Sequence, residues 1–178
     1  LIILIEDMEE IKKITGQVEI SPLVVSDIKK EIKDTSDFKG KIEKSLNKKV
    51  SDIVEIILTG AFFLEGSDVH MEPEEKRAKL RLRIDGVLQD ILYLDLKIYK
   101  NLVSRIKLLS GLKLNVTSRP QDGRFSILIE GVSIEVRASA LPAEYGESIV
   151  LRILNPKWVV TMDDLGLRQD LMDVFKKE

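Results

Sequence analysis

The chain has 178 residues, of which 44% are apolar and none is cysteine, and its formal net charge is −2. This length and apolar content suffice for one substantial core and part of a second. The missing cysteines exclude disulfides, thiol catalysis and cysteine-ligated zinc, as suits a reducing cytoplasm. The near-neutral, mixed charge is not that of a nucleic-acid-binding surface, and no apolar run approaches the roughly eighteen residues that a membrane span needs.

Residues 1–36 predict four short elements: a strand at 1–5, a helix at 7–16, a strand at 17–25 and a helix for which Ser26 is a plausible N-cap. Together they would make up half a domain. Residues 37–49 carry many charges and few apolar anchors, which predicts a linker or a loose helix. Because the chain opens on a leucine and ends in a helical pattern, we expect an excised fragment.

A β-hairpin is predicted between two core-facing helices, at residues 50–66 and 95–112. Its turn is Asp85-Gly86, a strong short-range hairpin signal, and the residues on either side alternate between apolar and polar. A two-residue turn at this point places Arg81 opposite Asp90, so that opposite charges face each other across the strands.

A second hairpin, with its turn at Glu130-Gly131, is predicted after the second helix. In this register Arg124 lies directly opposite Arg137, and such like-charge pairs cost up to roughly 1 kcal/mol. Something must offset this repulsion. Glu135, diagonal to Arg124 on the same face, could do so together with solvent screening; a bound polyanion could also do so, because two guanidinium groups on a rigid sheet suit phosphate oxygens.

The machinery that would itself hold a phosphate is absent from the sequence. The 178 residues contain no G-x-x-x-x-G-K-[ST] loop and no G-x-G-x-x-G pattern. His70 is the single histidine, which excludes multi-histidine metal sites, and we interpret it as structural. Nothing in the sequence fixes the geometry of a Ser-His-Asp triad.

Six motifs stand in the order seen in secretion ATPases of the type II secretion and type IV pilus assembly family: "GSDVHMEP", "LRLRIDGVLQ", "SRIKLLSGL", "RPQDGR", "IEVRASALPAEYGESIVLRIL" and "DDLGL". The chain resembles this family over about residues 50–168. The resemblance implies an α+β fold, with a PAS-like second N-terminal domain at 50–157. It also implies the end of a first N-terminal module, a small α/β unit, at 1–36 and a linker at 158–178 toward a RecA-type ATPase domain absent from this chain.

The resemblance further implies that the second N-terminal domain closes over the nucleotide, with Arg124 and Arg137 reaching its phosphates and Arg152 as a weaker candidate. The whole protein would be a homo-hexameric ATP hydrolase that uses ATP and Mg²⁺, whereas this fragment alone would be inactive. Its partners would be the RecA-type domain, neighbouring subunits and inner-membrane platform proteins, with no nucleic acid, at the cytoplasmic side of the inner membrane. The alternative is a free-standing PAS-like sensor or ligand-binding module.

Overall fold

A computed structural model of the chain describes residues 16–155 together with residues 166, 168, 172 and 174. The strands form one seven-stranded sheet in the order β1-β5-β6-β7-β2-β3-β4, in which β1 pairs parallel with β5 and the other pairs are antiparallel. The elements in chain order are β1 (Gln17–Glu19), α2 (Pro22–Glu31), α3 (Thr35–Glu43), α4 (Val50–Phe63), β2 (Asp68–Pro73), β3 (Ala78–Ile84), β4 (Val87–Leu94), α5 (Leu96–Leu109), β5 (Gln121–Ile129), β6 (Val132–Ala143) and β7 (Gly146–Leu154).

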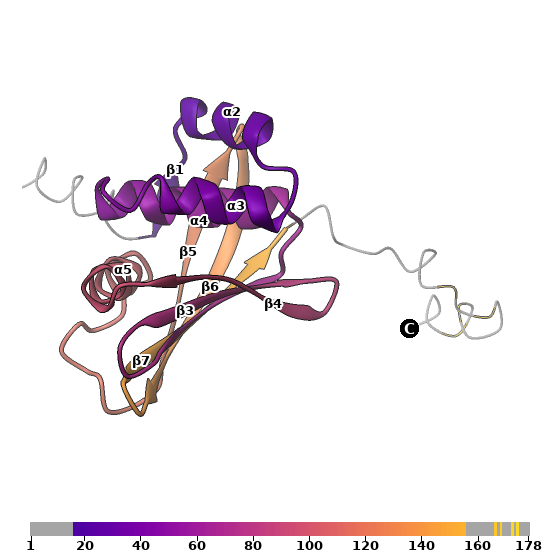
Figure 1. Cartoon of the computed structure of the whole chain (residues 1–178). Coiled ribbons are helices and arrows are strands. Elements are labelled where there is room, and N and C mark those ends of the chain that lie inside the picture. Colours follow the sequence, from indigo (N-terminus) through magenta and orange to yellow (C-terminus); the bar gives the residue numbers. More distant parts are fainter. Residues whose placement is uncertain (1–15, 156–165, 167, 169–171, 173, 175–178) are drawn as a thin grey trace, which may run out of the picture.

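The helices cover one face of the sheet, and the other face carries the polar side chains of the strands. In Figure 1, α3 and α4 cross in front of β5 and β6, with α2 above them and α5 below. The central helix is α4, whose buried face packs against α2, α3 and α5. The sheet contributes alternate residues to this core, among them Val69, Met71, Leu80, Leu82, Phe125, Ile127, Ile134, Val136, Ile149, Leu151 and Ile153.

Both predicted hairpins are confirmed in their turns and registers. Asp85 and Gly86 have φ angles of 48° and 77°, and Glu130 and Gly131 have 51° and 78°. Two successive positive φ values are the mark of the tight turn whose twist matches that of the flanking strands. The registers follow from these turns, since Ile84 pairs with Val87 in one hairpin and Ile129 pairs with Val132 in the other. The first register holds as far as the predicted pair of Arg81 and Asp90 and shifts by one residue before Leu80.

The N-terminal elements differ from the prediction. The strand predicted at residues 17–25 ends at Glu19, and α2 already begins at Pro22. The assignment of Ser26 as an N-cap is therefore wrong, because this residue lies inside α2. The valines of this segment favour a strand, but proline is well suited to the first turn of a helix. The spacing of Val25 and Ile28 then places both side chains in the core, so tertiary packing overrides local propensity.

The segment predicted as a linker or loose helix, residues 37–49, is helical as far as Glu43, and this helix is anchored in the core. Asp34 caps α3 by accepting hydrogen bonds from the backbone N–H groups of Ser36 at 2.8 Å and Asp37 at 2.9 Å. Phe38, one turn further along, is fully buried. A Cβ atom on Gly60 of α4 would lie 2.4 Å from the Phe38 ring, so this glycine allows the close approach of the two helices.

A buried ion pair fixes the loop that leads into β5. Lys107 of α5 is 1% exposed, and its Nζ lies 2.7 Å from Oε1 of Glu147, at the start of β7. The same ammonium group donates to the carbonyl oxygen of Val116 at 2.8 Å. Gln121, the first residue of β5, donates to that oxygen as well, at 2.7 Å. The loop between α5 and β5 is thereby tied to both of its neighbours.

The coarse fold class is confirmed: residues 16–155 form a mixed α/β structure with four helices and a seven-stranded sheet. No helix among the described residues is long and apolar enough to cross a membrane. The elements predicted at 1–15 and most of the linker predicted at 158–178 lie outside the described residues. The division of the chain into domains at residues 36, 49 and 157 stays a prediction.

Candidate functional site

A row of charged side chains crosses the polar face of the sheet. Cross-strand pairing places Arg124 opposite Arg137, and Arg137 opposite Arg152. Beyond Arg152 the row continues to Asp68 on β2 and then to Arg83 on β3. Directly opposed residues point to the same face of a sheet, so all five side chains share the face away from the helices. Neighbouring strands lie about 4.8 Å apart, so the first three arginines span about 10 Å.

The structure brings the predicted site residues together. The pairing of Arg124 with Arg137 is the predicted one, and Arg152 extends it directly by one strand. The sequence contained the signal for this extension, because a two-residue turn between Ala143 and Gly146 sets the register of β6 and β7. We refer to Arg124, Arg137 and Arg152 as the arginine row.

The members of the arginine row differ in their partners. Arg137 donates through Nε to Oε1 of Glu135 at 3.3 Å, and Arg152 donates through Nε to Oδ1 of Asp68 at 2.8 Å. The side chain of Arg124 is exposed and makes no hydrogen bond or ion pair within the described part of the chain. Glu135 thus pairs with its neighbour two positions along β6 and not with the diagonal Arg124. The guanidinium group of Arg124 keeps its donors for solvent or a ligand.

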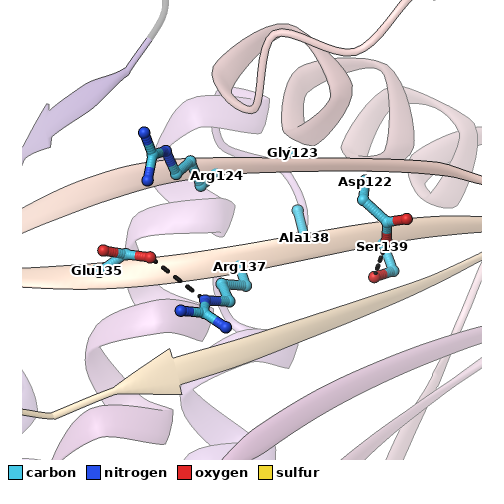
Figure 2. Close-up of a pocket in the computed structure, with 7 residues that line it drawn as sticks. All are labelled: Asp122, Gly123, Arg124, Glu135, Arg137, Ala138 and Ser139. Carbon is cyan, nitrogen blue, oxygen red and sulfur yellow. Dashed lines mark hydrogen bonds and ion pairs between the residues drawn. The ribbon is translucent and has the colours of Figure 1, made fainter.

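An open depression of about 500 Å³ lies over β5 and β6, at the Arg124 end of the arginine row. Figure 2 shows Arg124 and Arg137 extending toward its Glu135 end, away from Asp122 and Ser139. At the opposite end the Ser139 hydroxyl donates to Oδ1 of Asp122 at 2.5 Å. The depression is lined by Asp122, Gly123, Arg124, Glu135, Arg137, Ala138 and Ser139.

Gly123 brings β5 close to the end of α5. A Cβ atom at this position would lie 2.3 Å from the backbone oxygen of Ser110, the residue that ends the helix. No side chain fits there unless the backbone moves, which explains on steric grounds why "QDGR" has a glycine at this position. It sets the position of Arg124, the next residue.

Asp68 is the site residue that sequence reasoning missed. Its side chain is 5% exposed and lies between two arginines, with Arg152 Nε at 2.8 Å and Arg83 Nε at 3.2 Å. The Ser67 hydroxyl adds a third contact at 2.8 Å. Burial pushes the pKa of Asp68 up, but the hydrogen bonds from Arg152 and Ser67 and the charges of Arg152 and Arg83 outweigh it, so the pKa lies below its usual range.

His70 lies on β2 with its side chain 18% exposed and Nδ1 at 3.7 Å from Glu72. Burial lowers the pKa of His70, and the nearby carboxylates of Glu72 and Asp68 oppose that shift. Among residues 16–155 no group of three or more His, Asp or Glu side chains is placed to hold a metal ion. The arginine row supplies guanidinium groups, which bind phosphate and carboxylate oxygens through paired N–H donors.

Comparison with known proteins identifies the family of this chain. The family model described as type II/IV secretion system protein matches residues 40–178. Type II secretion system protein E of Xanthomonas campestris pv. campestris is 38% identical over 128 residues, which are 70% of this chain and 22% of that protein. Type IV pilus assembly ATPase TfpB of Acinetobacter baylyi is 37% identical over 122 residues, which are 67% of this chain and 21% of that protein.

The X-ray structure of the Legionella pneumophila ATPase DotB is similar with a TM-score of 0.42 at 18% identity, over 71% of this chain and 35% of that chain; this likeness is too slight to carry an argument. The chain spans about a fifth of the length of the two curated relatives. The family match covers more than half of the chain, and the two identities agree with it. The chain therefore belongs to the type II/IV secretion system protein family.

Proposed function

We propose that this chain is the N-terminal region of a motor ATPase that powers type II protein secretion or type IV pilus assembly, and that its arginine row contacts the phosphates of the bound nucleotide. The observation that carries the proposal is the alignment of Arg124, Arg137 and Arg152 on an open sheet face, where the side chain of Arg124 makes no hydrogen bond or ion pair with the described residues. Family membership supports a role in secretion or pilus assembly, and the name of the Acinetobacter baylyi relative supports the ATPase part.

The chemical role of the arginine row follows from the charge of the substrate. Phosphoryl transfer spreads negative charge over the equatorial oxygens of the transferred group, and positioned guanidinium groups stabilise that charge. Their effect grows when water is excluded, since charges attract more strongly at low dielectric constant. In the whole protein a RecA-type domain would hold ATP with Mg²⁺, and the sheet face would close over it.

The finer organisation belongs to the same proposal. Residues 50–157 would form a PAS-like second N-terminal domain, with the end of a first module before it and a linker after it. The whole protein would form a hexamer in the cytoplasm and act on platform proteins of the inner membrane. These features rest on family membership, since residues 40–178 match the family. The chain spans about a fifth of its two relatives, which supports a longer whole protein with further domains.

Steady-state ATP turnover of the whole protein tests the proposal. Arg124→Ala and Arg137→Ala should each lower turnover per folded molecule by about ten-fold or more, the scale on which removal of a preorganised charge donor acts. The matched control is Arg81→Ala, on the same sheet face and paired with Asp90, which should leave turnover unchanged. Unchanged turnover in both Arg124→Ala and Arg137→Ala would refute a role in phosphate contact.

A further inference from the structure

We propose that Asp68 is a positioning residue, which holds the guanidinium group of Arg152 by its Nε edge and leaves its outer N–H groups directed at the nucleotide phosphates. The inference rests on the function proposed above and adds one residue to it. It is carried by the position of Asp68 in the charged row, opposite Arg152 on one side and opposite Arg83 on the other.

The exposed fractions of the two side chains show that Asp68 is the buried, fixed partner and that Arg152 extends toward solvent. The side chain of Asp68 is 5% exposed, whereas that of Arg152 is 63% exposed although its Nε lies 2.8 Å from the carboxylate. A guanidinium group has five N–H donors, and Nε supplies one of them. The guanidinium group of Arg152 is thus held at Nε, while its Nη groups extend beyond the buried carboxylate.

The other side of the carboxylate is fixed in turn. Arg83 places its Nε 3.2 Å from Oδ2 of Asp68, and its Nη1 donates to the carbonyl oxygen of Gly86 at 3.0 Å. Gly86 belongs to the tight turn between β3 and β4, so Arg83 connects Asp68 to a rigid part of the backbone. Two strands, β2 and β3, therefore support the orientation of one arginine on β7.

This arrangement also explains how a third arginine can join the row. Arg137 and Arg152 are directly opposed, and such a pair is unfavourable without a counter-charge. Asp68 supplies the counter-charge beneath Arg152, as Glu135 does for Arg137. In both pairs the carboxylate contacts Nε, so the Nη edge of each guanidinium group remains for a polyanion.

A double-mutant cycle on the whole protein tests the inference. Asp68→Asn and Arg152→Ala should each lower ATP turnover per folded molecule by about three-fold or more, with the same division between kcat and KM. The double variant should be no slower than the slower single variant, because both changes act through one guanidinium group. Asp90→Asn is the matched control: it removes the negative charge from an Nε-to-carboxylate contact of the same 2.8 Å length on the same face, and turnover should stay unchanged.

The outcomes separate this inference from the proposed function. Reduced turnover in Arg124→Ala and Arg137→Ala, but not in Asp68→Asn or Arg152→Ala, overturns the positioning role and the phosphate contact of Arg152, and leaves the phosphate contacts of Arg124 and Arg137 standing. Unchanged turnover in all four variants overturns both. Effects of Asp68→Asn and Arg152→Ala that multiply in the double variant also overturn the positioning role. If Asp68→Asn does not fold, Arg152→Ala remains informative, because Asp68 keeps Arg83 and Ser67 as partners, and unchanged turnover in it overturns the inference.

Discussion

The carboxylate of Asp68 makes the stability of the fold depend on pH. Its pKa is lower in the folded chain than the ordinary value of about 3.9. The stability that it contributes is therefore fully present above about pH 4 and is lost as the pH falls through the folded pKa. We expect the difference in unfolding free energy between the 178-residue chain and its Asp68→Asn variant to narrow from pH 5 to pH 2. Urea titrations at several pH values measure this, and a constant difference would contradict it.

Arg124 should contribute nothing to stability. It is exposed, opposes another arginine and has no partner among the described residues. We expect Arg124→Ala to leave the unfolding free energy of the chain unchanged within about 0.5 kcal/mol, or to raise it slightly, because a like-charge pair is removed.

Arg137→Ala is the matched variant, since it removes the same repulsion together with an exposed ion pair to Glu135, worth about 0 to 1 kcal/mol. It should therefore be neutral or slightly stabilising. Denaturant unfolding measures both changes. A loss above about 1.5 kcal/mol in either variant would identify a structural anchor and weaken the case for phosphate contact.

At the scale of the elements, the buried pair of Lys107 and Glu147 connects α5 to the start of β7. Replacing Lys107 by Met should destabilise the chain by about 3–5 kcal/mol, because the carboxylate of Glu147, 9% exposed, would be left buried without its cation. Urea unfolding measures the loss. The double variant Lys107→Met with Glu147→Gln should lose less unfolding free energy than Lys107→Met alone. An equal or larger loss would show that packing, not charge, dominates the contribution of this pair to stability.

The contact between β5 and the end of α5 predicts the effect of a small change next to Arg124. Gly123→Ala would place a Cβ 2.3 Å from the Ser110 backbone oxygen, so β5 must shift, at a cost of about 1–3 kcal/mol. Gly40→Ala in α3 is the control. Nothing lies within 4 Å of its Cβ, and alanine favours a helix by about 0.5–1 kcal/mol. A melting temperature of Gly123→Ala equal to or above that of the unmodified chain would refute the steric role of Gly123.

At the scale of the whole molecule, local sequence signals predicted the facing arginines of the site, but not the residue that holds Arg152 in place. The tight turns at Asp85-Gly86 and Glu130-Gly131 fix the hairpin registers within a few residues, so Arg124 could be placed opposite Arg137 from sequence alone. Asp68 could not be placed in this way. Its contact with Arg152 depends on the pairing of β2 with β7, which no local turn determines.

The N-terminal helices show the same dependence on distant contacts. Val25 and Ile28 take helical spacing because α4 provides a surface to bury them, and the charged segment around Phe38 becomes a helix because Gly60 opens a place for the ring. Such packing partners lie far away in the sequence. Local signals alone predict a strand that runs up to Val25, and a linker or loose helix around Phe38.

The chain alone should not hydrolyse ATP. Its 178 residues contain no G-x-x-x-x-G-K-[ST] loop, which supplies the backbone cradle and the lysine for the phosphates in P-loop enzymes. We expect the rate of phosphate release with Mg²⁺ and ATP to equal that of a buffer control. Turnover that copurifies with the folded chain and is lost in a variant of the arginine row would contradict this expectation.

The pairing of β2 with β7 also has a consequence for folding kinetics. Asp68 and Arg152 are 84 positions apart, whereas the other strand pairs from β2 to β7 are joined by short connections. Closing a loop of that length costs entropy before any contact repays it. We therefore expect the β2–β4 meander and the β5–β7 meander to form first and to join late. Substitutions where they join should speed unfolding more than they slow folding.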